Sequence, residues 1–203
     1  MNLVTDLADQ AVILPVIIGV AVTVAVLGWP RGALAWVGAT GAAFGLMLVL
    51  KLVFLGCGSM LGFTRISSPS GHACAAALVA GGLVAMVRDS RPWVVSAAIV
   101  AAFIIGTTRV MLGAHSTEEV ILGGTVGVAG AVVLHAIAGP RPPLRLLPIA
   151  IVVAGIVLAM HGTRLPAEVT IRQTASLIGR IIPACHPTPP RWSELAPSAR
   201  AGT

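Results

Sequence analysis

Long apolar segments separated by short polar turns make up most of this chain. A helix needs roughly 20 apolar residues to cross a hydrocarbon core about 30 Å thick, and six segments approach or reach that length. They cover residues 11–27, 33–55, 71–87, 93–112, 120–138 and 144–160. Because lipid offers no partner for an unpaired backbone group, such segments are expected to be helical. The pattern predicts an all-α, polytopic membrane protein with six transmembrane helices in one bundle.

Composition supports this prediction and places a boundary near the end of the sixth segment. Of the 203 residues, 57% are hydrophobic and 10% are charged, whereas soluble domains carry about 25% charged residues. From Thr163 onward polar residues and prolines replace the apolar runs. We therefore expect a transmembrane domain over residues 1–162 and a polar tail over residues 163–203. An interfacial helix within 169–182 would begin this tail, and a disordered end would follow it.

Charge and cysteine content narrow the classes of partner. The net charge is +6, but the basic residues are dispersed among turns and the tail, so they do not form a nucleic-acid surface. The three cysteines, Cys57, Cys74 and Cys185, lack metal-ligand spacing and are too few and odd in number for a disulfide framework. We expect small apolar fillers or free thiols, no metal and no cofactor. The sequence does not specify an oligomeric state.

Six crossings place the loops 56–70 and 113–119 and the tail on one face of the membrane, here called the site side. The opposite, turn side holds Arg31, Arg88, Arg91, Arg141 and Arg145. Cytoplasmic loops are enriched in Lys and Arg near the helix ends. Apart from the basic residues considered below, the site side has Arg164, Arg172 and Arg180 in the part of the tail that directly follows the sixth segment. The distribution favours a bacterial cytoplasmic membrane protein whose site side is extracytoplasmic.

The first group of candidate residues lies around the beginning of the third segment. Lys51 falls in the last turns of the second segment, where it either snorkels to the interface or contributes a buried charge. Ser70 is suited to cap the third helix. The free N–H groups of a helix N-terminus form an anion site, which Gly71 leaves open and beside which His72 would lie.

The second group follows the fourth segment. Arg109 has a planar fork that matches phosphate oxygens and needs a partner in an apolar span, and His115 follows in the next loop. Ser116 and Glu119 form a capping-box pattern, so Glu119 serves either the helix start or the chemistry. Lys51, His72, Arg109 and His115 all fall on the site side, which predicts a single pocket.

These residues resemble two motifs of the type 2 phosphatidic acid phosphatase family, whose phosphate pocket is shared with vanadium haloperoxidases. The motifs are Pro-Ser-Gly-His at residues 69–72, and Arg109 with His115 and Glu119. The family usually has Ser and Asp where this chain has Thr108 and Glu119. Its first motif is a lysine followed after six residues by Arg-Pro. Counting from Lys51 gives Gly-Ser, so the motif arginine is missing; Arg65 in the same loop is a candidate replacement.

The resemblance implies a metal-independent phosphatase or phosphotransferase. His115 would attack phosphorus, Glu119 would hold the tautomer of His115, and His72 would act as the general acid and base. The residues implied to bind the phosphoryl oxygens are Lys51, Arg65, Ser70, Gly71 and Arg109.

A pocket at helix ends beside hydrocarbon suits a lipid phosphate, such as phosphatidic acid or undecaprenyl diphosphate, whose tail stays among membrane lipids. Two alternatives remain at this stage. The first is a catalytically degenerate phospholipid-binding or transport protein that keeps the anion pocket, favoured by the missing arginine. The second is a structural membrane subunit, which leaves Arg109, His72 and His115 unexplained.

Overall fold

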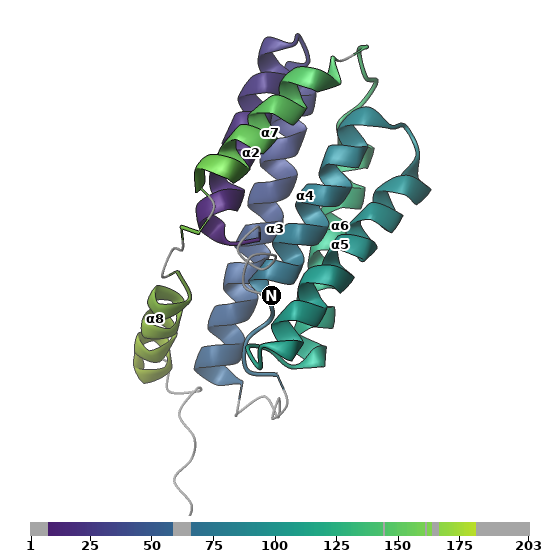
Figure 1. Ribbon diagram of the computed structural model, residues 1–203. Helices are drawn as coiled ribbons and strands as arrows, with labels where there is room; N and C mark the ends of the chain where they lie inside the picture. The colour runs from purple at the N-terminus through teal and green to yellow at the C-terminus, as the bar shows by residue number, and fades with distance from the viewer. Residues whose placement is uncertain (1–7, 59–65, 144, 161, 164–166, 182–203) are drawn as a thin grey trace, which may run out of the picture.

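The computed structural model describes residues 8–58, 66–143, 145–160, 162–163 and 167–181, and these residues form helices joined by short turns (Figure 1). The all-α prediction is confirmed for this part of the chain. In chain order the helices are α2 (Gln10–Val26), α3 (Pro30–Cys57), α4 (Gly71–Val87), α5 (Arg91–Met111), α6 (Thr117–Ile137), α7 (Leu146–Met160) and α8 (Ala167–Ile181).

Three of these helices are long and apolar enough to cross a membrane: α3, α5 and α6. The apolar helices α2, α4 and α7 have 17, 17 and 15 residues, which corresponds to about 26, 26 and 23 Å at 1.5 Å per residue. They are thus shorter than a hydrocarbon core of about 30 Å. Residues 182–203, for which a disordered end is predicted, lie outside the described residues.

Local signals in the sequence set the ends of the helices that lead to the site. Asp9 caps α2, because its carboxylate accepts a hydrogen bond of 2.9 Å from the Ala11 N–H. Gly28 has a φ of 90°, which glycine adopts without strain, and Pro30 then begins α3. At the other end of the molecule, Ser116 and Glu119 form the capping box that begins α6.

Helix α4 lies at the centre of the bundle and packs against α5 and α6. Small residues make this packing close: a Cβ on Gly123 would collide with the Ser70 carbonyl oxygen, and a Cβ on Gly127 would collide with the Cys74 carbonyl oxygen. Glycines four residues apart form one stripe on a helix, and such stripes let two backbones approach. The stripe brings the start of α6 against the start of α4, where both sequence motifs lie.

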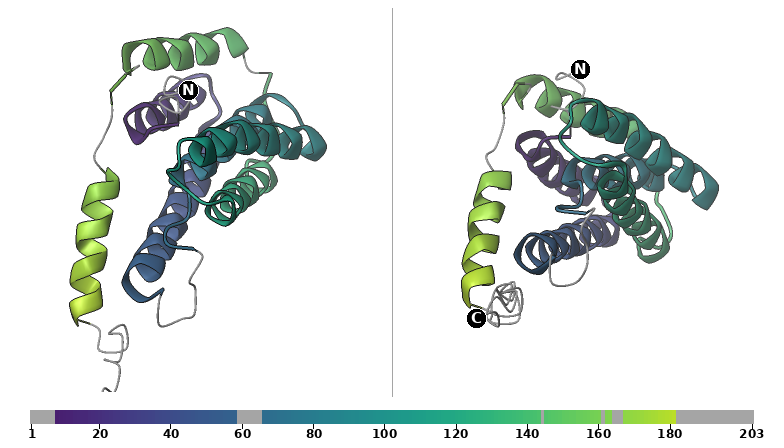
Figure 2. Two further views of the ribbon diagram at one scale, coloured as in Figure 1. Left: turned by 60° about the horizontal axis from the view of Figure 1, so that its bottom comes forward. Right: turned by 90° about the horizontal axis from the view of Figure 1, so that it is seen from below.

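Helices α2 and α3 form the other half of the bundle. The indole N–H of Trp36, a fully buried residue, donates a 3.0 Å hydrogen bond to the Ile17 carbonyl and ties the two helices together. Helix α7 packs on α2, and α8 contacts α3 at the periphery (Figure 2). Cys74 is a free buried thiol as expected, whereas Cys57 at the end of α3 is disulfide-bonded, contrary to the expectation of a filler or free thiol.

Candidate active site

His115 and Glu119 form the tightest polar pair of the site. His115 Nδ1 lies 2.8 Å from Glu119 Oε2, and only 6% of either side chain is exposed. His115 belongs to the short loop before α6, and Glu119 is one helical turn into that helix. Since an ionised carboxylate can only accept, the Nδ1 atom carries the proton. The Nε2 atom therefore presents its lone pair.

The other oxygen of Glu119 fixes the loop before α4. Glu119 Oε1 accepts hydrogen bonds from the Ser67 N–H at 2.7 Å, the Ser67 hydroxyl at 2.7 Å and the Ser68 N–H at 2.8 Å. The Ser116 N–H donates to Oε2 at 3.2 Å. One carboxylate thus completes the capping box, orients His115 and holds the motif loop. The capping and orienting roles, which are alternatives in the sequence, coexist in the structure.

Burial and neighbouring cations control the charge of His115. Burial is the largest effect and lowers the pKa of this imidazole, and the positive charges of Lys51 and Arg109 act in the same direction. The hydrogen bond and charge of Glu119 oppose them without reversing the shift. His115 is therefore neutral near pH 7, which is the form that has a nucleophilic nitrogen.

Lys51 does not snorkel to solvent. Its side chain is 6% exposed, and its ammonium donates to Ser68 Oγ at 3.1 Å and to Glu168 Oε2 at 2.6 Å. The aliphatic stem passes the start of α4, since a Cβ on Gly71 would lie 3.6 Å from Lys51 Cε. Of the two alternatives for Lys51, the structure shows the buried charge.

His72 lies in the first turn of α4 and faces the start of α2. Its Nε2 atom is 3.9 Å from Asp9 Oδ2, and 24% of its side chain is exposed. This separation is an ion-pair distance rather than a hydrogen bond. Asp9 thus places a negative charge beside His72.

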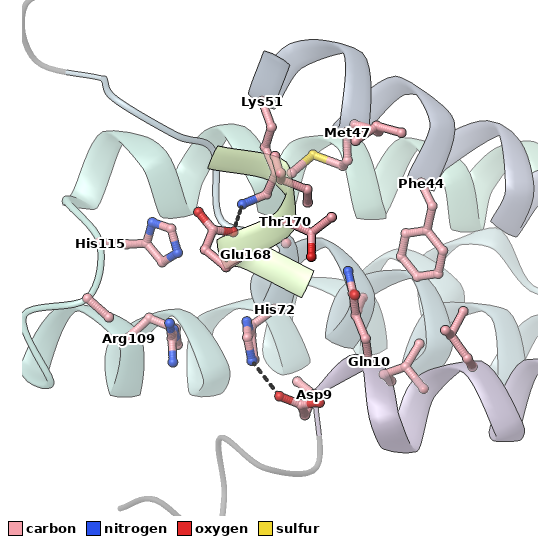
Figure 3. Close-up of a pocket in the computed structure, with 18 of the residues that line it drawn as sticks. Asp9, Gln10, Phe44, Met47, Lys51, His72, Arg109, His115, Glu168 and Thr170 are labelled. Carbon is pink, nitrogen blue, oxygen red and sulfur yellow. Dashed lines mark hydrogen bonds and ion pairs between the residues drawn. The ribbon is translucent and has the colours of Figure 1, made fainter. Parts of the chain in front are cut away.

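One cavity of about 630 Å³ gathers the predicted residues. Lys51, Gly71, His72, Arg109 and His115 line it, from four different segments of the chain. Figure 3 shows the side chains of Lys51, His72, Arg109 and His115 converging. The cavity has a second, apolar wall that includes Ile13, Leu14, Phe44, Met47 and Leu48. The arrangement can hold a small anion against two cations and two imidazoles, beside an apolar groove.

Two predicted phosphate ligands need a separate account. Ser70 is fully buried, its hydroxyl accepts from the Ala73 N–H at 3.4 Å, and its own N–H donates to the Glu119 carbonyl at 2.9 Å. Both groups are thus engaged in the helix start, so Ser70 positions α4 and does not line the cavity. Arg65 lies outside the described residues.

Residues 55–143 match the family model for the PAP2 superfamily. This segment is similar to the PAP2 superfamily over less than half of the chain, and it is called the PAP2 region below. The resemblance inferred from the motifs is confirmed, and because members of this superfamily are phosphatases, the PAP2 region supports a phosphoric ester hydrolase. Searches of the curated proteins and of the solved structures found no significant match. Lys51 and α8 lie outside the PAP2 region, on either side of it.

Asp9, Ser67 and Glu168 of the site were missed in the sequence, and Ser68, which begins the polar segment Ser-Pro-Ser-Gly-His, was given no role. Ser67 directly precedes this segment and could have been included in it. For Asp9, the only indication in the sequence of a structural role was its position just before the first apolar segment. Glu168 is 117 residues from Lys51, and no local pattern connects them.

Proposed function

We propose that the protein is a membrane phosphatase that hydrolyses a lipid phosphate or polyprenyl diphosphate through a phosphohistidine intermediate. The observation that carries the proposal is the 2.8 Å contact between His115 Nδ1 and Glu119, in a cavity lined by Lys51, His72 and Arg109. A neutral, oriented imidazole beside two cations is the arrangement that nucleophilic attack on a phosphate monoester requires.

In the first step, His115 Nε2 forms a bond to phosphorus while the bond from phosphorus to the ester oxygen breaks. The charge that develops on the imidazole is stabilised by Glu119, and His72 donates a proton to the leaving oxygen. Arg109 and Lys51 bind the phosphoryl oxygens, whose charge is spread over three atoms in the transition state.

In the second step, water attacks the phosphohistidine. His72, now neutral, accepts a proton from that water, and the phosphorus–nitrogen bond breaks. Inorganic phosphate leaves, and His115 and His72 return to their starting protonation states. Every proton is thus accounted for by the two histidines and the water molecule.

The apolar wall of the cavity supports a lipid substrate. Ile13 and Met47 are buried in it, whereas Leu14 and Leu48 are each 45% exposed on the outer surface of α2 and α3. A groove that is buried at one end and open at the other suits a hydrocarbon tail that remains in the bilayer, while the headgroup phosphate lies between Lys51 and Arg109. A water-soluble phosphate ester would leave this wall uncovered.

The test is phosphate release from phosphatidic acid and from a polyprenyl diphosphate in detergent micelles with excess chelator. We expect turnover by the natural protein, loss of turnover in His115→Gln, and retention in His135→Gln. The second substitution is a matched control, because His135 lies beside Asp89, 3.4 Å away, and does not line the cavity. Brief exposure to ³²P-labelled substrate should leave acid-labile label on the natural protein. Full activity in His115→Gln would refute the proposal.

A phospholipid-binding or transport protein is the second candidate. Two observations favour it: the Lys51 ammonium is already paired with the Glu168 carboxylate, and the arginine of the first motif is missing. It predicts that lipid phosphate binds equally well to the natural protein and to His115→Gln, with no turnover in either. The same panel of substrates therefore separates the two functions.

We further propose that all six apolar helices cross a cytoplasmic membrane and that the site is extracytoplasmic. Large apolar side chains exposed on the outer faces of the helices support the crossings; examples are Val26 (80%), Leu34 (75%), Phe103 (73%), Ile121 (62%) and Leu158 (79%). The disulfide at Cys57 on the site side supports the orientation, because disulfides persist in oxidising compartments. Reporter fusions in the turn at residues 139–143 should report a cytoplasmic location.

A further inference from the structure

The start of α8 enters the site from outside the PAP2 region. Glu168, in the first turn of α8, places Oε2 at 2.6 Å from Lys51 Nζ and Oε1 at 3.4 Å from Ser68 Oγ. Figure 3 shows the carboxylate reaching into the cavity toward Lys51. Thr170, Ile171 and Arg172 of the same helix also line that cavity. Helix α8 therefore closes part of the cavity wall and contributes an anion to its interior.

A carboxylate at this position uses the same donor that a phosphate would use. A charge-assisted bond from an ammonium to a carboxylate oxygen has the length and strength of one to a phosphoryl oxygen. Lys51 and Arg109 are the two cavity cations to which the proposed mechanism assigns the phosphoryl oxygens. While Glu168 is bound, the charge of Lys51 is already compensated.

Glu168 is ionised where it lies. Burial would raise its pKa, but the hydrogen bond from Lys51 and the positive charges of Lys51 and Arg172 outweigh burial, so the pKa of Glu168 is lowered. Arg172 Nη2 is 3.4 Å from Glu168 Oε1, one turn further along α8. The carboxylate thus enters the cavity as an anion at neutral pH.

Few of the described side chains of α8, residues 168–177, are buried against the bundle: Ala175 is buried, whereas Val169 and Leu177 are 55% and 56% exposed. Figure 2 shows α8 at the edge of the bundle rather than within it. Elements with few buried apolar contacts open at low free-energy cost. Displacement of α8 would therefore leave the helices around the cavity in place.

We propose that α8 is an autoinhibitory lid whose Glu168 carboxylate takes the place of a phosphoryl oxygen on Lys51, so that the substrate phosphate must displace it. The inference rests on the proposed function for its biological meaning, but the competition is between anions and is measured without turnover. The apparent affinity for phosphate is reduced by the fraction of molecules in which Glu168 occupies Lys51.

The experiment is calorimetric binding of inorganic phosphate to the purified full-length protein, together with KM and kcat for phosphatidic acid. Glu168→Gln keeps the size of the side chain and removes its charge. Glu118→Gln is the matched control, since it removes one exposed carboxylate on the same side of the molecule. Both substitutions are repeated in a Lys51→Met background, because a coupling through Lys51 must vanish there.

We expect Glu168→Gln to bind phosphate about three- to tenfold more tightly than the natural protein and to lower KM by a similar factor. Glu118→Gln should leave both values unchanged, and the gain should disappear with Lys51→Met. Unchanged or weaker phosphate binding in Glu168→Gln, or a gain that persists without Lys51, would overturn the lid. Tighter binding with no turnover in any form supports the lid and refutes the phosphatase. Turnover of phosphatidic acid without tighter phosphate binding in Glu168→Gln supports the phosphatase and refutes the lid.

Discussion

Glu119→Gln is the substitution that tests the geometry of the site most directly. The amide has the size of the carboxylate, so no cavity is created, but one of its two ends is an NH₂ group that cannot accept. In the structure Glu119 Oε1 accepts from three donors of the loop at Ser67 and Ser68, and Oε2 accepts from Ser116 and faces His115. Whichever way the amide is turned, its NH₂ group meets donors.

The less costly orientation keeps the amide oxygen on the three loop donors. The NH₂ group then faces the Ser116 N–H, which loses its acceptor at a cost of about 1–3 kcal/mol. The NH₂ group also faces the N–H group at His115 Nδ1. Two donors would then point at one another unless Nδ1 loses its proton and becomes an acceptor. The proton of the imidazole moves to Nε2, and the atom that should attack phosphorus no longer has a lone pair.

Two measurements follow from this change. The free energy of unfolding should fall by about 1–3 kcal/mol from the lost acceptor, and kcat for phosphate release should fall by a factor on the order of 10²–10⁴, as when a catalytic histidine is held in the wrong tautomer. KM should change little, because Lys51 and Arg109 are untouched. The assay is phosphate release from phosphatidic acid in micelles, with denaturant unfolding in parallel.

Glu119→Asp and Glu118→Gln serve as controls. Aspartate keeps the negative charge, but its side chain is one methylene shorter, so its carboxylate lies farther from His115. We therefore expect partial activity. Glu118 is exposed on the same helical turn, so its substitution should have no effect on kcat. A folded Glu119→Gln protein with kcat within about twofold of the natural protein would show that Glu119 does not set the tautomer of His115.

Two further predictions concern the pH dependence and the packing of the site. Because the pKa of His115 is lowered, the imidazole stays neutral below its usual pKa of 6.5; protonation of the nucleophile should therefore reduce kcat only below pH 6.5, and a loss of activity on acidification centred above pH 6.5 would contradict this. Gly123→Ala places a Cβ against the Ser70 carbonyl oxygen, so it should lower the unfolding free energy by about 1–3 kcal/mol and reduce kcat by displacing the start of α4. Gly38→Ala, which meets nothing within 4 Å, should not lower the unfolding free energy, since alanine favours a helix more than glycine does, and it should leave kcat unchanged.

The sequence by itself determined the helices and the side of the bundle on which the chemistry lies. The long apolar segments must be helical, because unpaired backbone groups are too costly in lipid. Since successive helices run in opposite directions, Lys51, His72, Arg109 and His115 then lie at the same end of the bundle. The two motifs were recognisable because they are local: each is a helix start or end whose polar residues stand out against apolar neighbours.

Only the tertiary structure decided how these ends are connected. The capping box could not reveal that the second oxygen of Glu119 holds the loop at Ser67 and Ser68, because that contact depends on the glycine stripe that brings α6 against α4. The buried environment of Lys51 and its partner Glu168 likewise depend on where α8 lies. These hydrogen bonds join residues 51 to 117 positions apart in the sequence. They follow from packing, and local sequence carries no signal for them.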